Sequence, residues 1–258
     1  MLKYDRILAL SEWHKKNLMS VHNLHSDHVV VTRNGIDLNR FKKDIKRNRF
    51  KVINSSSPDR SWPVLLECWP SIKAQVPEAE LHLFYGFKNW ECMAQNDPNQ
   101  LALIDFLKKQ IESMKDLGVV YHDRINQDQL AEEFLSSGMW IYPTWFSETS
   151  CITAMEAQAA GCRIVTSPIT ALNETVGNRG AMIPGDWTSL EYKQKFINTV
   201  VLFLEKRSEV DREKIQKYAQ DHFGLDELAQ DWENMLQELL EEVEVNPFIP
   251  YQPIKEYV

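Results

Sequence analysis

The sequence predicts an α/β fold: a Rossmann-like parallel sheet with helices on both faces, followed by extra C-terminal helices. Short β-branched or apolar runs alternate repeatedly with amphipathic segments between residues 50 and 167, which is typical of such a sheet. Polar segments at 55–60, 121–126 and 143–151 each follow a strand-like run. The composition, 43% hydrophobic and 26% charged, is that of a globular chain with a buried core.

The N-terminal part is expected to contain two strands and a helix, followed by a turn and a connector. Its expected elements are a strand over 4–10, a helix over 12–22 capped by Ser11, a strand over 28–32, an Asn-Gly turn over 33–37 and a basic connector over 38–49. Ser11 suits the cap position because its hydroxyl can accept a hydrogen bond from a free helix N–H group.

The main sheet is expected to begin at residue 50. Its expected strands are 50–54, 80–86, 118–122, 139–143 and 163–167. Its expected helices are one that starts near Pro63 and runs to 75, then 101–117, 127–136, a helix that starts near Thr149 or Ser150, and finally 188–206, 209–221 and 226–243. Apolar residues three and four positions apart predict these helices.

Charge and cysteine usage exclude several classes of protein. The net charge of −8 argues against general binding to nucleic acid or anionic membranes. The cysteines (Cys68, Cys92, Cys151 and Cys162) form no CxxC pair, which favours free thiols in a reducing compartment. Neither a signal peptide nor a membrane-spanning run is found. The sequence therefore predicts a cytoplasmic protein.

The ligand is expected at the carboxyl ends of the strands, where doubly wound sheets bind ligands. The three polar segments named above lie at that edge. None of them contains GxGxxG, so the dinucleotide fingerprint is missing and NAD is not expected.

The segment SETSCITAMEAQAAG (147–161) places Glu148 and Glu156 eight positions apart. A helix that starts between them would offer positive charge and free N–H groups to phosphate or sugar oxygens. Two carboxylates at this spacing suit a ligand with hydroxyls at both ends. On spacing alone an alternative stays open, in which Glu148 only favours the helix dipole and Glu156 is an exposed polar residue.

Three other features suggest chemistry. His22, His25 and His28 are spaced three apart, but they adjoin a strand and are expected on the surface, so no metal site is predicted. Cys151 lies at a helix start, where a thiol pKa can fall, but no histidine accompanies it and a nucleophile is not expected. His122 is either a base or, as its position in the 121–126 loop favours, a packing or ligand contact.

These segments together resemble the retaining GT-B glycosyltransferases of family four. The quoted stretch is similar to their E-x7-E motif. Further segments resemble the family in the expected order: NGID (34–37) with Phe41, SSSPDR (55–60), residues 76–86, residues 119–149 and NETVGNRGAMIPGD (173–186). The resemblance covers roughly residues 28–240 and implies the donor half of a GT-B fold.

The resemblance also implies roles for single residues. Glu148 would be the catalytic residue and accept hydrogen bonds from the donor sugar, and Glu156 would bind the ribose. The donor-binding set it implies is Arg60, Arg124, Ile125, Thr149, Ser150, Cys151, Ile152 and Glu156. The family's second basic residue would fall on Ser55. Diphosphate neutralisation would therefore rest on Arg60, with help from the helix terminus or Arg124.

The implied function is transfer of a hexose, with retention, from a UDP- or GDP-linked sugar, without a cofactor or metal. Residues 1–45 would be the end of an acceptor-type domain and a linker, 46–222 the donor-binding domain, and 223–258 a C-terminal helix and tail. The acceptor half would be missing or supplied by another chain. The C-terminal helix would then pack elsewhere or form a homo-oligomer. The alternative is a non-catalytic nucleotide-sugar-binding or assembly module that needs a partner acceptor domain.

Overall fold

Two parallel sheets of unequal size organise residues 6–205 and 212–245, the part of the chain that the computed structural model describes. The smaller sheet pairs β1 (Ile7–Ala9) with β2 (Val29–Val31), and α1 (Glu12–His22) connects them. We call residues 6–31 the N-terminal unit. As predicted, Ser11 caps α1, with its hydroxyl accepting a hydrogen bond from the His14 N–H at 3.0 Å.

The larger sheet has six parallel strands in the order β5-β4-β3-β6-β7-β8. The strands are β3 (Asn48–Asn54), β4 (Glu80–Leu83), β5 (Val119–Tyr121), β6 (Ser137–Tyr142), β7 (Arg163–Thr166) and β8 (Ala181–Met182). From β3 the chain adds β4 and then β5 on one side. It then crosses back to place β6 on the other side of β3 and continues outward with β7 and β8. This is the Rossmann order, with its switch point between β3 and β6.

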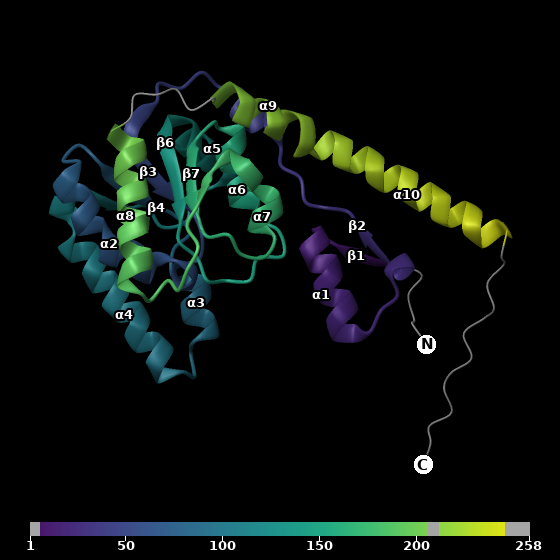
Figure 1. The fold of residues 1–258 in the computed structure, drawn as a ribbon, viewed down its shortest axis with the longest axis horizontal. Helices are drawn as coiled ribbons and strands as arrows, with labels where there is room; N and C mark the ends of the chain where they lie inside the picture. The colour runs from purple at the N-terminus through teal and green to yellow at the C-terminus, as the bar shows by residue number, and fades with distance from the viewer. Residues whose placement is uncertain (1–5, 206–211, 246–258) are drawn as a thin grey trace, which may run out of the picture.

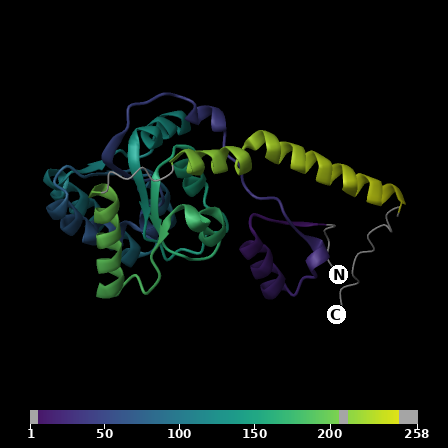
Figure 2. The same cartoon turned by 45° about the horizontal axis from the view of Figure 1, so that its top comes forward.

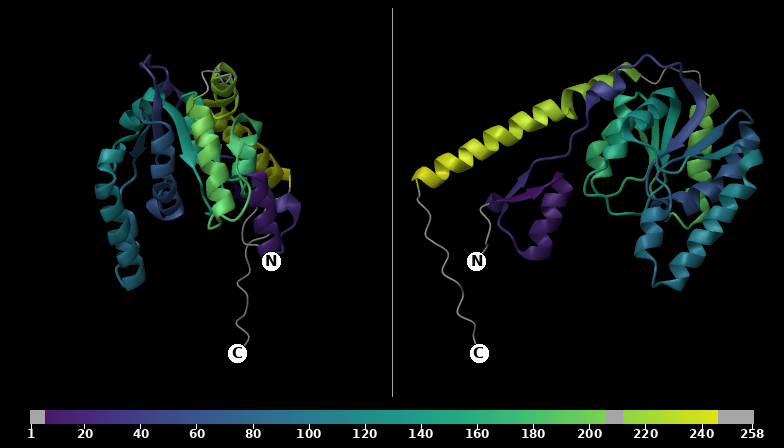
Figure 3. Two further views of the ribbon diagram at one scale, coloured as in Figure 1. Left: turned by 60° about the vertical axis from the view of Figure 1, so that its left-hand side comes forward. Right: turned by 180° about the vertical axis from the view of Figure 1, so that it is seen from behind.

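Helices cover both faces of this sheet, as Figures 1 and 3 show. One face carries α2 (Trp62–Gln75), α3 (Lys88–Met93), α4 (Pro98–Ser113) and α8 (Leu190–Glu205); the other carries α5 (Gln127–Ser136), α6 (Ile152–Ala159) and α7 (Leu172–Thr175). Alternate residues of one strand enter opposite cores, with Val52 in the first and Ile53 in the second. The predicted α/β fold class is confirmed.

The start of α6 differs from the sequence-based expectation. The helix begins at Ile152, because Cys151 has extended backbone angles (φ −120°, ψ 92°) and acts as its N-cap. Residues ahead of it are held by other segments: the Glu148 carbonyl accepts the Ala171 N–H at 3.2 Å, and the Thr149 carbonyl accepts the Ser11 hydroxyl at 2.8 Å. These tertiary bonds keep the chain out of the helix. The short elements α3, α7 and β8 were also not predicted individually.

The last two helices lead away from the sheet. α9 (Arg212–His222) packs on α6, and α10 (Leu225–Val245) extends outward past the N-terminal unit (Figures 1 and 2). The linker residue Ile36 fixes the junction, since its N–H donates to the Phe223 carbonyl at 2.8 Å and its carbonyl accepts the Leu225 N–H at 3.2 Å. Within the described residues, no helix combines the length and apolar character that crossing a membrane requires.

An irregularity lies in the central strand pair. The pairing shifts between Asn48↔Ser137 and Val52↔Met139, so that β3 bulges opposite Gly138. A Cβ at Gly138 would lie 2.2 Å from the Arg49 carbonyl oxygen and 2.6 Å from its carbon. Only a glycine therefore lets β3 and β6 approach each other here.

We expect Gly138→Ala to lower the free energy of unfolding by about 3 kcal/mol, because rigid backbone of the central pair must move apart. Urea denaturation followed by circular dichroism measures this loss. Gly224→Ala is the matched control, since a Cβ there meets only the end of the Leu38 side chain at 3.2 Å, and a change below about 1 kcal/mol is expected. Equal losses in both variants would contradict the role of close strand approach.

Candidate functional site

The loops that follow β3 and β6 face each other at the switch point. Asn54, the last residue of β3, ties them together: its side-chain amide donates to the Ile141 carbonyl at 2.8 Å. The Asn54 side-chain oxygen accepts the Trp62 indole N–H at 2.9 Å and the Ser56 N–H at 3.2 Å. Asn54 is fully buried. Its bonds fix the 55–61 loop, including the short 3-10 helix Pro58–Arg60, against β6.

An ion pair connects the two loops. Arg60 Nη1 lies 3.3 Å from Glu148 Oε1. The same oxygen accepts the Tyr142 hydroxyl at 2.7 Å. Tyr142 is the last residue of β6 and is fully buried, so it holds the carboxylate in place. The structure therefore brings Arg60 and Glu148, which are 88 residues apart in sequence, into direct contact.

Glu148 keeps one oxygen without a partner. Only Oε1 takes part in hydrogen bonds with described residues, and Oε2 accepts none. Burial raises the pKa of Glu148 above its ordinary value, while the bond from Tyr142 and the charge of Arg60 oppose that shift. A buried carboxylate with a free oxygen is suited to accept a hydrogen bond from a ligand hydroxyl.

The chain that enters α6 presents a row of free N–H groups. From Thr149 to Thr153, no backbone N–H donates to another described residue. The Ser150 hydroxyl and, across the switch point, the Ser55 hydroxyl are also buried without a partner in the described chain. Free N–H groups at a helix start attract anions. The predicted residues Thr149, Ser150, Cys151 and Ile152 thus lie together beside Glu148.

Glu156 is buried inside α6, with 8% of its surface exposed. It follows Ile152 by about one helical turn, not the two turns expected from the sequence, because α6 starts later. Burial raises its pKa to about 7, and the nearby charge of Arg40 partly opposes this. Among the described residues, no group hydrogen-bonds to its carboxylate. The alternative that Glu156 is merely an exposed polar residue is wrong.

The 121–126 loop lies next to the end of β4. Arg124 is exposed, and its side chain has no partner in the described chain, whereas Ile125 packs against the core under α5 and α6. His122 stacks on Phe84 with 4.3 Å between ring centroids and shares a 2.9 Å hydrogen bond with His82. Burial lowers the pKa of His122 and that of His82, the latter to about 4. His122 is therefore neutral near pH 7 and has packing contacts.

Cys151 lacks the environment of a nucleophile. It is 4% exposed, and burial raises its pKa to about 12, so its thiol stays protonated at neutral pH. His25, of the spaced histidines, is exposed and pairs with Asp27 at the surface. In the described parts of the chain, no group of three metal-binding side chains is found.

The N-terminal unit contacts this site directly. The Glu174 carboxylate accepts the N–H groups of Glu12 at 2.9 Å and Trp13 at 2.7 Å, at the start of α1. Ser11 donates to the Thr149 carbonyl, in the segment that carries Glu148. A negative charge at a helix N-terminus stabilises the contact.

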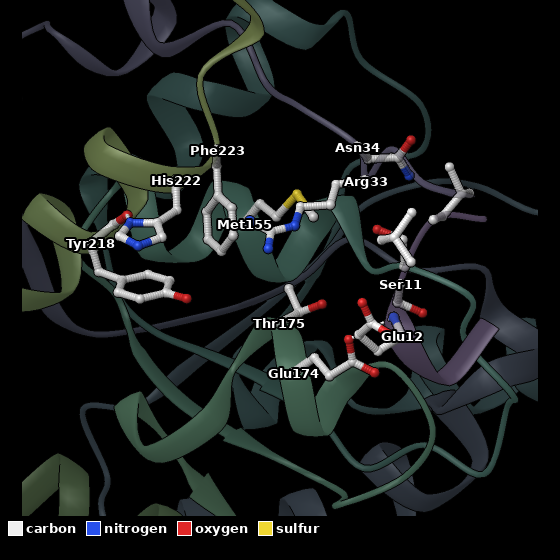
Figure 4. A pocket seen from close by; sticks show the side chains of 13 residues that line it. Ser11, Glu12, Arg33, Asn34, Met155, Glu174, Thr175, Tyr218, His222 and Phe223 are labelled. Atoms are coloured by element: carbon white, nitrogen blue, oxygen red, sulfur yellow. Dashed lines mark hydrogen bonds between the residues drawn. The ribbon is translucent and has the colours of Figure 1, made fainter. Parts of the chain in front are cut away.

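A cavity of about 210 Å³ lies beside this contact, between the N-terminal unit and helices α6, α7 and α9 (Figure 4). Figure 4 shows Arg33 and Asn34 on one side and Tyr218 and His222 on the other. Ser150 lines this cavity, but Glu148 and Glu156 do not. The cavity and the switch point are therefore neighbouring but separate features.

Sequence reasoning missed four residues of the site. Tyr142 and Asn54 stood in expected strands, Arg40 in the connector, and Phe146, whose ring contacts Arg60, in the polar loop. A polar side chain at the end of a buried strand was the available signal for Asn54 and Tyr142. Nothing in the sequence indicated that Arg40 approaches Glu156, because that proximity depends on the path of the connector.

Comparison with known proteins gives a family and several similar folds. The model of the family described as glycosyl transferases group 1 matches residues 54–199, more than half of the chain. No curated protein sequence matches the chain.

Several solved structures are similar at low sequence identity. One is the pneumococcal O-GlcNAc transferase GtfA in complex with UDP and GlcNAc, with 18% identity and a TM-score of 0.72 over 92% of this chain and 46% of that one. Another is Anabaena Alr3699/HepE in complex with UDP and glucose, with 16% identity and a TM-score of 0.72 over 91% of this chain and 63% of that one. A structure of the GtfA/B complex also matches, with 15% identity and a TM-score of 0.69 over 92% of this chain and 46% of that one. The chain spans less than two thirds of each.

The buried Glu156 predicts a pH dependence of stability. Its carboxyl has a pKa of about 7 in the folded chain against an ordinary 4.5, so the folded state holds the proton more tightly. The contribution of Glu156 to the free energy of unfolding is fully present below pH 4.5. It is lost as pH rises from about 4.5 through 7, by an amount on the order of 3 kcal/mol. The lowered pKa values of His82 and His122 make stability rise over an overlapping pH range, so the difference between variant and unaltered chain isolates Glu156. In urea denaturation, we expect Glu156→Gln to gain stability relative to the unaltered chain from pH 5 to pH 8. Glu78→Gln, at an exposed position, should show no such gain; a difference independent of pH in Glu156→Gln would contradict the assignment.

Proposed function

The chain belongs to the group 1 glycosyltransferases, and from this we propose that it binds a nucleotide-diphosphate sugar at the switch point and transfers the hexose with retention. Residues 46–222 form the donor-binding domain in this proposal, residues 1–45 are the end of an acceptor-type domain with its linker, and residues 223–258 are a C-terminal helix and tail. Residues 1–5, 206–211 and 246–258 of this division lie outside the described residues. The sugar nucleotide is a substrate, and no cofactor is involved.

One observation carries the proposal: hydrogen-bond acceptors and donors that have no partner in the described chain lie together around the Arg60–Glu148 pair. Glu148 offers Oε2, an acceptor for a sugar hydroxyl, and the residues from Thr149 to Ile152 offer N–H donors for phosphate oxygens. Beside them, Arg60 Nε and the Ser55 and Ser150 hydroxyls are buried without a partner in the described chain. Buried polar groups are rarely left so unless a ligand provides the partner. A sugar attached to a diphosphate has hydroxyl donors next to anionic oxygens, which complements the carboxylate of Glu148 and the adjoining N–H groups.

The leaving group is the nucleoside diphosphate, on which negative charge grows as the bond to the sugar breaks. Arg60 and the free N–H groups before α6 stabilise that charge, because they are already in position before the reaction. Ser55 contributes a hydroxyl donor but no charge. Arg124, which is exposed in the neighbouring loop, is free to reach a bound diphosphate as well.

Glu156 and the 121–126 loop bind the nucleoside in this proposal. The unpartnered Glu156 carboxylate accepts hydrogen bonds from the two ribose hydroxyls, which reduces the unfavourable burial of its charge. Backbone groups of Arg124 and Ile125 contact the base. The GtfA and Alr3699/HepE structures named above contain UDP, so UDP is the first nucleotide to test against GDP.

A second candidate function is a non-catalytic module that binds the nucleotide sugar and is completed by an acceptor domain on another chain. It is favoured by the similarity to the GtfA/B complex, in which GtfA is part of an assembly. Measuring sugar release or transfer from the bound donor, with and without such a partner, separates the two functions.

We expect calorimetric titration to detect binding of UDP or GDP and of the corresponding sugar conjugates. Glu156→Ala and Arg60→Ala should each weaken binding by about ten- to a hundredfold, since each removes a charged hydrogen-bond partner of about 1.5–3 kcal/mol. Arg60→Ala should weaken the binding of a nucleoside diphosphate more than the binding of the nucleoside alone. Glu156→Ala should weaken the binding of both.

Glu78→Ala, at an exposed position outside the site, is the control and should bind as the unaltered chain does. Binding that both site variants leave unchanged would place the nucleotide elsewhere. An absence of binding to every nucleotide tested would overturn the proposed function for this chain.

A further inference from the structure

The ring of Phe146 lies against the guanidinium group of Arg60. Arg60 Cζ is 3.7 Å from the centre of the ring, which is the geometry of a cation–π contact. The two residues come from different sides of the switch point, Arg60 from the loop after β3 and Phe146 from the loop after β6. The contact therefore exists only because the strand order brings the loops together.

Phe146 has little role in the hydrophobic core. It is 37% exposed, and none of the three clusters of buried side chains in the described chain includes it. Its backbone, by contrast, is held firmly: its N–H donates to Thr144 Oγ1 at 3.0 Å, and its carbonyl accepts the Glu148 N–H at 2.9 Å. One short turn thus fixes both the Phe146 ring and the Glu148 carboxylate, and both contact Arg60.

These two contacts leave one edge of the guanidinium without a hydrogen-bond partner among the described residues. Glu148 takes Nη1, and the ring covers one face. Nε is buried without a partner in the described chain, and Nη2 has no partner there either. Nε and Nη2 form one planar edge of two parallel N–H donors, which matches two oxygens of a phosphate.

We propose that Phe146 is a positioning residue, which holds the Arg60 guanidinium so that its free edge binds the diphosphate of the donor. This inference rests on the proposed function and deepens it, because it assigns the phosphate contact to one edge of one side chain. Without the ring, the long Arg60 side chain regains rotamer freedom and no longer presents that edge in a fixed orientation. The nucleoside part of the ligand does not depend on this contact.

Calorimetric titration of the full chain tests the proposal, with UDP and GDP as diphosphates and uridine and guanosine as competing nucleosides. Phe146→Leu should weaken diphosphate binding by about tenfold and leave nucleoside binding unchanged. Phe146→Tyr should keep most of the diphosphate affinity that Phe146→Leu loses, because the tyrosine ring offers Arg60 the same aromatic face. Phe106→Leu, at a 54% exposed position on α4, should have no effect.

A double-mutant cycle with Arg60→Ala adds a readout that a merely structural role would not change. In the Arg60→Ala background, Phe146→Leu should cause no further loss of diphosphate binding. Equal losses for diphosphates and nucleosides, additive losses in the cycle, or full affinity in Phe146→Leu would each overturn the inference and leave the proposed function intact. If the unaltered chain bound no nucleotide, both would fail.

Discussion

The parallel pairing of β3 with β6 is the constraint on which the site depends. These strands are neighbours in the sheet, yet the chain passes through β4 and β5 between them. The loops at their carboxyl ends therefore meet at the switch point, where Arg60 contacts Glu148. Asn54 crosses this position from β3 to the Ile141 carbonyl of β6. The close approach at Gly138 keeps the same strands together at the other end of the pair.

The site combines firmly held groups with unsatisfied ones. Tyr142 and Asn54 are fully buried and hydrogen-bonded, and they fix the loops that carry Glu148 and Arg60. Glu156, by contrast, is buried without a hydrogen-bond partner in the described chain. Such a group lowers the stability of the unliganded protein, and a ligand that supplies the partner recovers the loss. In the proposed function, stability and ligand binding therefore make opposite demands on this residue.

The contact with the N-terminal unit adds a mechanical connection. Ser11 bonds to the residue next to Glu148, and Glu174 holds the start of α1. Ile36 joins the linker to the junction of α9 and α10. The N-terminal unit is thus joined to the segment that precedes α6, at the residue that follows Glu148, by a specific hydrogen bond from Ser11 to the Thr149 carbonyl.

The sequence by itself determined the α/β class, nearly all the long elements and the segments that hold the candidate residues. It could do so because hydrophobic periodicity and helix caps are local signals. Only the tertiary structure decided that Arg60 meets Glu148, that Tyr142 bonds to Glu148 and Phe146 contacts Arg60, and that Arg40 approaches Glu156. It also moved the start of α6 to Ile152, through bonds from Ser11 and Ala171. These facts depend on strand order and on contacts between distant segments, which no local pattern encodes.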